Sequence, residues 1–195
     1  MQTSPLILAS SSPRRRDLLA EAGFVFSAIS PRVREKFHVD LTVRELTVWN
    51  AVRKGLWAAR YHPNAIVLAA DTLVALDHEI LGKPANLKEA AQFLRRLSGR
   101  VHQVCSGVFM CHLARGRSTI IAEISHVRFR PLDAAKIDKY FSRINPLDKA
   151  GAYAAQGHDA EIISQVEGSF SNVVGLPMER TIAALREFGI KPKPP

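Results

Sequence analysis

The sequence has little of what marks secreted, membrane or disulfide-rich proteins. It contains two cysteines, Cys105 and Cys111, which are too few for a disulfide framework or a zinc site. Six residues apart on one strand-like segment, they lie too far apart to bridge directly. No apolar run approaches the roughly 20 residues that span a bilayer, and the N-terminus lacks the segments of a secretory signal. We therefore expect reduced thiols, no membrane partner and a cytoplasmic protein.

The common nucleotide and metal motifs are also missing. There is no GxxxxGK[ST] phosphate loop and no GxGxxG pattern. His102, His112 and His126 are dispersed along strand-like segments without metal-ligand spacing. The formal net charge of +9 favours an anionic partner, but lysine and arginine are spread along the chain without a long block. A nucleic-acid-binding arm is therefore not indicated, and we expect no stable nucleic-acid complex.

What is present suits one globular domain. The chain has 195 residues, of which 47% are hydrophobic and 23% charged. Short apolar runs alternate with helical patterns, and there is no internal repeat or long linker. We expect a single domain with two lobes over residues 1–190, followed by a disordered tail, KPKPP, over residues 191–195.

The segment LILASSSPRRRDLL, residues 6–19, predicts a buried strand, a serine turn and a helix. Pro13 suits the first helical position, and a preceding serine can cap the helix. Three arginines, Arg14, Arg15 and Arg16, fall in the first turn, where the helix dipole favours anions and each cation costs roughly 0.3–1 kcal/mol. A bound polyanion would offset that cost through hydroxyls, free N–H groups and guanidinium forks. The alternative is that the arginines simply point into solvent.

Asp71 follows the apolar run AIVLAA, residues 65–70, and residues 72–76 continue as strand. Open α/β sheets place ligand sites where such strands end. A carboxylate there could orient or deprotonate an attacking water, or bind a divalent cation together with phosphate oxygens. An aspartate at a strand end is also often a turn or cap residue, and position alone leaves both readings open.

Between these two segments, Thr42 followed by Glu45 forms a capping box, which predicts the start of a second helix. An apolar stripe follows at helical spacing, formed by Leu46, Trp49, Val52, Leu56 and Ala59. Lys54 falls on the opposite side, where it is either solvated or lines a cleft. Further along, DKAGAYAAQG, residues 148–157, reads as a functional loop, and GSFSNVVG, residues 168–175, as a second glycine-bounded loop.

Three long motifs occur in order: LASSSPRRRDLL, AADTLVALDHEILGKP, and DKAGAYAAQG with EGSFSNVVGLP. Together they resemble the Maf family of nucleoside triphosphate pyrophosphatases from about Leu6 to Phe188. The resemblance implies an inosine-triphosphatase-like α/β fold, with a twisted mixed sheet, flanking helices and two lobes around a central cleft. It also implies hydrolysis of a nucleoside triphosphate to the monophosphate and pyrophosphate, a divalent metal (Mg or Mn) and a homodimer.

The resemblance places the family's site residues on this sequence. The proton acceptor falls on Asp71, which with the loop residue Glu35 would position the metal. The phosphate-binding residues fall on Ser10, Ser12, Arg14, Arg15, Lys54 and Lys83.

Three positions separate substrate classes in the family, and here they are Arg14, Thr72 and Gln156. This set resembles the branch that acts on dTTP and UTP. The branch acting on 7-methyl-GTP typically has a bulky aromatic, a glutamine and a glutamate there. An amide at Gln156 offers a pyrimidine edge both a donor and an acceptor, which a carboxylate cannot.

Two segments depart from the family pattern. The acidic residues of D-x-D-E are replaced by Arg32 and Arg34 in PRVREK, and NAVRKG stands where LAxxKA is more usual around Lys54. We predict a pyrophosphatase for dTTP and UTP, including modified pyrimidine nucleotides. The alternatives are a non-catalytic nucleic-acid or division-associated binding protein, and a pyrophosphatase for modified purine nucleotides.

Overall fold

The computed structural model describes residues 4–34 and 40–193, and its centre is a mixed, seven-stranded sheet. The strands run in the order β2-β1-β3-β5-β6-β7, and β4 pairs with β3 off this path. Their bounds are β1 Leu6–Ala9, β2 Ser27–Ile29, β3 Ile66–Leu76, β4 Glu79–Leu81, β5 Val101–His112, β6 Arg117–Phe129 and β7 Ile163–Glu167. The α/β fold class with a mixed sheet and flanking helices is thereby confirmed.

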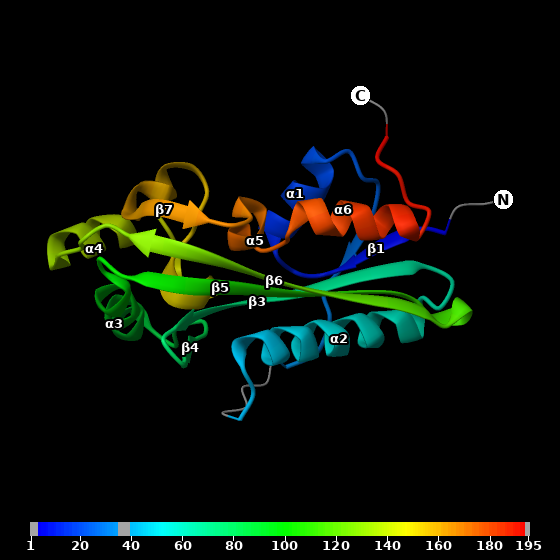
Figure 1. The fold of residues 1–195 in the computed structure, drawn as a ribbon, viewed down its shortest axis with the longest axis horizontal. Coiled ribbons are helices and arrows are strands. Elements are labelled where there is room, and N and C mark those ends of the chain that lie inside the picture. Colours follow the sequence, from blue (N-terminus) through cyan, green and yellow to red (C-terminus); the bar gives the residue numbers. More distant parts are fainter. Residues whose placement is uncertain (1–3, 35–39, 194–195) are drawn as a thin grey trace.

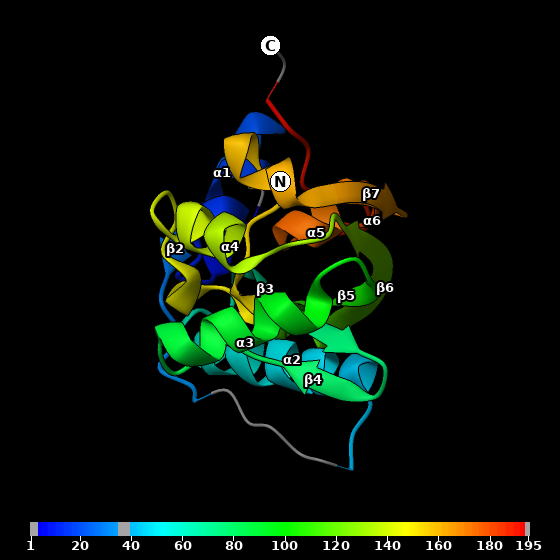
Figure 2. The same cartoon turned by 90° about the vertical axis from the view of Figure 1, so that its left-hand side faces the viewer.

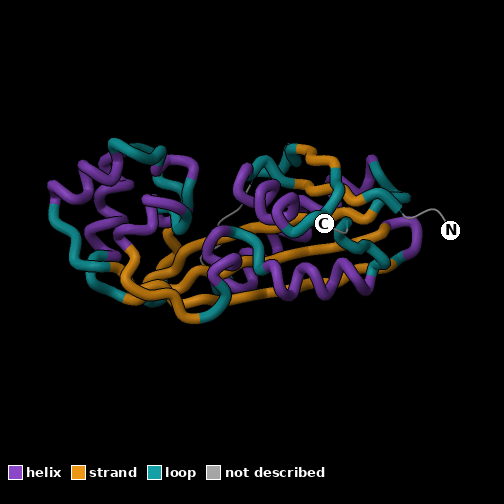
Figure 3. The backbone as a smooth tube through the Cα atoms, turned by 90° about the horizontal axis from the view of Figure 1, so that it is seen from above, coloured by secondary structure: helices purple, strands orange, loops and turns teal. Residues whose placement is uncertain are grey.

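Helices cover both faces of the sheet. They are α1 Pro13–Glu21, α2 Val43–Tyr61, α3 Leu87–Leu97, α4 Ala134–Phe141, α5 Phe170–Val174 and α6 Met178–Glu187. Helix α2 lies along one face, while α1, α5 and α6 lie on the other (Figures 1 and 2). Helices α3 and α4 gather at the end of the molecule away from both termini (Figure 1). Seen from above, the long strands run beneath two separate groups of helices (Figure 3).

Unequal strand lengths leave part of β3 uncovered. Strand β1 pairs in parallel with β3 from Leu6↔Ile66 to Ala9↔Ala69 and then ends. Strand β3 continues to Leu76, so Asp71 lies inside a long strand rather than at its end. The strand end that matters is that of β1, because the edge of β3 is free to face a site between Ala69, where β1 ends, and Val74, where β4 begins to pair.

The predicted inward face of α2 is partly wrong. Leu46 and Ala59 are buried as expected, but Trp49 is 45% exposed and Leu56 41% exposed, whereas Ala51, Lys54 and Ala58 are buried. The helix lies very close to the sheet, because a Cβ on Gly55 would overlap the Phe109 ring. Small residues therefore face the sheet over most of the helix, and Trp49 and Leu56 are turned outward.

Three smaller expectations also change. Ser12 precedes α1, but its side chain makes no capping hydrogen bond. Residues 168–175 are not simply a loop, since they contain α5, which Ser169 caps by accepting from the N–H of Asn172. In the tail, the N–H of Lys193 donates to the carbonyl of Gly23 at 2.8 Å. The predicted capping box of α2 is present, with Glu45 Oε2 accepting from the N–H of Thr42 at 2.9 Å.

Three buried clusters form the core. One packs beneath α2, one beneath α1 and α6, and one joins β3, β5 and β6 to α3 and α4. In the parts of the chain that the structure describes, no helix is both long and apolar enough to pass through a bilayer. Cys105 and Cys111 are buried free thiols on β5.

Candidate functional site

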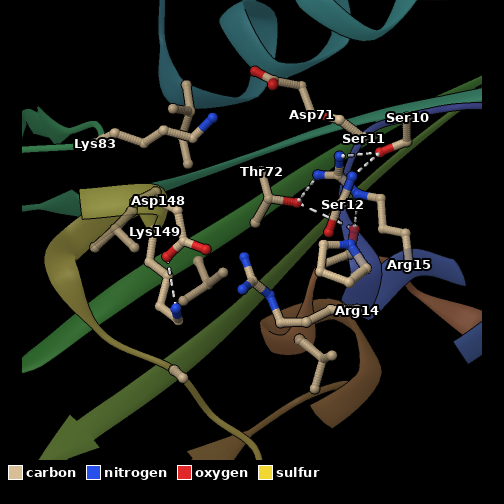
Figure 4. Close-up of a pocket in the computed structure, with 18 of the residues that line it drawn as sticks. Ser10, Ser11, Ser12, Arg14, Arg15, Asp71, Thr72, Lys83, Asp148 and Lys149 are labelled. Carbon is tan, nitrogen blue, oxygen red and sulfur yellow. Dashed lines mark hydrogen bonds and ion pairs between the residues drawn. The ribbon is translucent and has the colours of Figure 1, made fainter. Parts of the chain in front are cut away.

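A cavity of about 360 Å³ lies between the β1–α1 turn, the uncovered part of β3 and the loop after α4 (Figure 4). Its charged lining among the described residues is Arg14, Arg15, Lys54, Lys83, Lys149, Asp71 and Asp148. Cations thus outnumber carboxylates there, which favours a polyanionic ligand. A volume of this size falls within the roughly 300–1,000 Å³ typical of small-molecule sites.

Asp71 is held by two donors from α2. Lys54 Nζ lies 2.6 Å from Asp71 Oδ1, and Asn50 Nδ2 donates to Asp71 Oδ2 at 3.0 Å. All three side chains are buried, with Asp71 3%, Lys54 7% and Asn50 1% exposed. Because Asn50 and Lys54 are one helical turn apart, a single helix face supplies both donors. The carboxylate is therefore fixed while it still borders the cavity.

Arg15 ties the serine turn to β3 and α5. Its Nε donates to the carbonyl of Gly175 at 2.8 Å, and Nη1 donates to Ser10 Oγ at 3.2 Å. Nη2 donates to Thr72 Oγ1 at 2.9 Å, and that hydroxyl also lies 2.8 Å from Ser106 Oγ. The rigid guanidinium fork suits several acceptors at fixed angles. Thr72 lines the cavity and its hydroxyl also holds Arg15 in place.

Arg14, the neighbouring arginine, extends from α1 toward the cavity (Figure 4). It forms no ion pair or hydrogen bond with residues 4–34 or 40–193. Ser11 and Ser12 line the same end of the cavity, beside the N-terminus of α1. Hydroxyls, a guanidinium and a helix N-terminus together form a site that suits phosphate groups.

The opposite wall comes from the loop after β4 and the turns after α4. Lys83 lies in the loop after β4, and Asp148 and Lys149 come from the turns after α4 (Figure 4). Lys149 Nζ donates to Asp148 Oδ1 at 2.6 Å and to the carbonyl of Asn145 at 2.9 Å. Asp148 is half exposed and is therefore a weaker electrostatic partner than buried Asp71.

Tyr153 also lines this wall, and residues outside the cavity hold its ring in place. Its hydroxyl lies 2.8 Å from His102 Nε2, and both rings pack edge-on against Phe129. Burial lowers the pKa of His102 to about 4, so the imidazole is neutral at neutral pH. Burial likewise raises the pKa of Tyr153, which stays a phenol.

The structure brings most of the sequence-predicted site residues to one cavity. Those that line it are Ser10, Ser12, Arg14, Arg15, Lys54, Asp71, Thr72 and Lys83. Among the described residues, half-buried Gln156 lies outside the lining, one residue beyond Ala155, which belongs to it. Glu35 lies outside the described residues. Arg32 and Arg34 are exposed and lie outside the lining, whereas their neighbours Pro31 and Val33 belong to it.

Asn50, Asp148, Lys149 and Tyr153 belong to the site but were not predicted from the sequence. Asn50 precedes Lys54 by four residues, and helical spacing would have placed them together once Lys54 was known to be buried. Lys149 stands in DKAGAYAAQG, the segment predicted to be a functional loop, but no residue type singled it out.

The oxygen donors in the cavity suit a divalent cation of the Mg²⁺ type. Such ions are usually held by one or two carboxylates together with substrate phosphates and waters. Asp71 supplies a fixed carboxylate beside the cationic wall, and Asp148 a second one across the cavity. Within the described ranges no group of three or more His, Cys, Asp or Glu could hold a metal alone.

Fold and cavity together define a class of protein: a mixed α/β sheet with a cation-lined cavity around one buried carboxylate. The sequence narrows this class to one family. The profile of the Maf-like protein family matches residues 5–188, and the chain belongs to that family.

Curated relatives align over nearly the whole chain. A dTTP/UTP pyrophosphatase from Symbiobacterium thermophilum is 47% identical over 186 residues, covering 94% of each chain. One from Bacillus velezensis is 42% identical over 189 residues, covering 97% of this chain and 99% of its own. Among solved structures, a HAM1 protein from Coxiella burnetii aligns with a TM-score of 0.47 at 15% identity, covering 92% of this chain and 90% of its own.

Proposed function

We propose that this protein is a nucleoside triphosphate pyrophosphatase that hydrolyses dTTP and UTP to the monophosphate and pyrophosphate. The observation that carries the proposal is the cavity itself, where one fixed, buried carboxylate faces a wall of arginine and lysine. The relatives at 40–47% identity that are named dTTP/UTP pyrophosphatases support the choice of reaction and base.

The cationic residues bind and orient the triphosphate in this proposal. Arg14, Ser10 and Ser12 contact phosphate oxygens at the N-terminus of α1, and Lys83 reaches them from the other lobe. Arg15 keeps the serine turn in place through its bonds to Ser10 and Thr72. Positioning of this kind supplies much of the catalysis in phosphoryl transfer.

Asp71 accepts a proton from the attacking water. The water oxygen bonds to the α-phosphorus, and the bond from that phosphorus to the bridging oxygen breaks. The products are the nucleoside monophosphate and pyrophosphate. Lys54 and Asn50 hold the two oxygens of the carboxylate and so fix its direction toward the attacking water.

Asp71, with Glu35 as the further ligand implied by the family, would hold a divalent cation. When bound, that cation would neutralise phosphate charge and let a carboxylate approach the triphosphate. The homodimer and the cytoplasmic location remain predictions of the family resemblance.

Pyrophosphate release from dTTP and UTP, with and without Mg²⁺ or Mn²⁺, tests the proposal. We expect the wild-type protein to release pyrophosphate and D71N to lose about 10²–10⁴-fold in kcat, the range for removal of a general base. Unchanged turnover in D71N would refute the role of Asp71. Steeply salt-dependent DNA binding without turnover would favour the nucleic-acid-binding alternative.

A rate panel with dTTP, UTP, CTP, GTP and 7-methyl-GTP tests the choice of base. We expect the thymine and uracil nucleotides to give the highest kcat/KM. Preference for a purine would favour the modified-purine alternative, and it would show that Arg14, Thr72 and Gln156 do not select a pyrimidine.

A further inference from the structure

Asn50 differs from the rest of the site because it belongs to a segment that departs from the family pattern. The segment NAVRKG places asparagine where LAxxKA has leucine, four residues before the lysine. A lone asparagine on the buried face of a helix is costly unless its amide is hydrogen-bonded. Here the amide Nδ2 donates to Asp71 Oδ2 at 3.0 Å, so the polar side chain has a defined partner.

The two donors on α2 bind different oxygens of the Asp71 carboxylate. Lys54 takes Oδ1 at 2.6 Å, and Asn50 takes Oδ2 at 3.0 Å. A single donor would leave the carboxylate free to rotate about its last bond, whereas two donors on different oxygens fix its plane. Each oxygen still has a second lone pair with which to accept from water.

Asn50 acts from behind the site and not from within it. Asp71 and Lys54 line the cavity, but Asn50 is outside the described lining and only 1% exposed. A bound nucleotide in this cavity therefore meets Asp71 without touching Asn50. Loss of Asn50 should change what Asp71 does to the reaction, and leave the contacts of the phosphates unchanged.

We propose that Asn50 is a positioning residue of this chain, which fixes the plane of the Asp71 carboxylate for proton transfer from the attacking water. The proposal rests on the function given above for Asp71. It also gives a reason for the asparagine at position 50, where the family pattern has leucine.

The first test compares N50L with wild type in pyrophosphate release from dTTP. Leucine is the residue of the family pattern, so the fold should accept it. We expect kcat to fall about tenfold with KM within about twofold, because only the reacting group is displaced. The matched control is T47V, on the same buried helix face, where the Thr47 hydroxyl bonds to helix carbonyls and not to Asp71. Its kcat should equal that of wild type.

The second variant, N50Q, separates a hydrogen-bonding role from a packing role. Glutamine keeps an amide that can donate to Asp71 Oδ2, whereas leucine has no donor. We expect N50Q to retain more of the wild-type kcat than N50L does. Equal losses of kcat in a folded N50Q and a folded N50L would overturn the proposal, and N50Q with kcat and Tm equal to N50A would overturn it if N50L fails to fold.

A stability measurement separates this proposal from the proposed function. The loss in Tm caused by N50L is measured in wild type and in D71A, where no side-chain oxygen at position 71 can accept from Asn50 Nδ2. We expect a clear loss in wild type and a smaller one in D71A. Equal losses in both backgrounds, or an N50L enzyme with wild-type kcat or with only KM altered, would overturn the role of Asn50. A wild-type protein that hydrolyses no nucleotide would instead refute the proposed function. The Tm comparison would still show whether the hydrogen bond between Asn50 and Asp71 stabilises the protein.

Discussion

The floor and the rim of the cavity are built differently. On the floor, Asp71 is fixed by Lys54 and Asn50, and Arg15 is fixed by Ser10, Thr72 and Gly175. On the rim, Arg14 extends toward the cavity without a partner in the described ranges, and Asp148 and Lys149 are held mainly by each other. On the floor, β3, α2 and the start of α1 are bonded to one another through these side chains, whereas the rim consists of Arg14, from the same helix start, and of turns.

This difference separates two tasks. Groups that act on the reacting atoms gain from being fixed before the substrate arrives, because no reorganisation is then needed during the reaction. Groups that capture a flexible, highly charged ligand can be ordered by it. We therefore expect floor substitutions to lower kcat and stability, and rim substitutions to raise KM.

The largest expected effect comes from K54M. Removing the lysine leaves a buried carboxylate with one of its two donors lost, which costs about 3–5 kcal/mol when a buried pair is broken. We expect kcat for dTTP to fall by about 10²-fold or more and Tm to drop. Urea unfolding and pyrophosphate release measure the two effects. A fully stable K54M protein would show that the buried pair is not required for the fold.

The next effect concerns the close approach of α2 to the sheet. A Cβ on Gly107 would overlap the backbone of Thr47 on α2, and Gly107 pairs with Asp71 across β3 and β5. We expect G107A to push the helix away from Asp71, lowering stability by about 1–3 kcal/mol together with kcat. G116A is the control, because Gly116 has a φ of 60° but nothing near its Cβ, so it should lower stability without lowering kcat.

The same substitution at the neighbouring residues Arg14 and Arg15 tests the comparison between rim and floor directly. R15K loses the guanidinium fork that binds three acceptors, so we expect a stability loss of about 1–3 kcal/mol and a lower kcat. R14K keeps the charge at a position without protein partners among the described residues, so we expect unchanged stability and a KM raised several-fold. If both variants behave alike, the division between floor and rim is wrong.

The last effect is a pH dependence of stability carried by His102. Its pKa is about 4 in the folded protein against an ordinary 6.5, so folding favours the neutral imidazole. The stability it contributes is present above pH 6.5 and is lost as the pH falls toward 4, by about 3 kcal/mol at most. H102Q cannot titrate, so its Tm should fall less than that of wild type over this range. Parallel Tm curves would contradict the assignment.

The sequence predicted the local structure well wherever a local signal decides it. The strand at Leu6–Ala9, the helix start at Pro13 and the capping box at Thr42 depend on neighbours in the chain, and all are confirmed. The buried face of α2 was not predictable in the same way. A helix with Trp49 and Leu56 on one side and Ala51 and Ala58 on the other can bury either, and only the close fit around Gly55 and Gly107 decides between them.

The sequence was enough to predict which residues form most of the site, but not which of them bind one another. The motifs named Asp71, Lys54 and Arg15, yet the ion pair between Lys54 and Asp71 follows from the inward face of α2, which the sequence analysis assigned to the other side. In the same way, Thr72 was predicted to read the base, while its hydroxyl bonds to Arg15 and Ser106. Hydrogen-bond partners that are distant in sequence depend on how the helices pack on the sheet, so no local sequence pattern predicts them.

The most direct test of the account is a crystal structure of the wild-type protein with a dUTP analogue whose α,β-bridging oxygen is replaced by NH. The account predicts the α-phosphorus beside Asp71, with Arg14, Ser10 and Lys83 on the phosphates and the Lys54–Asp71–Asn50 contacts unchanged. A triphosphate bound outside this cavity, or one that leaves Asp71 remote from the α-phosphorus, would contradict it.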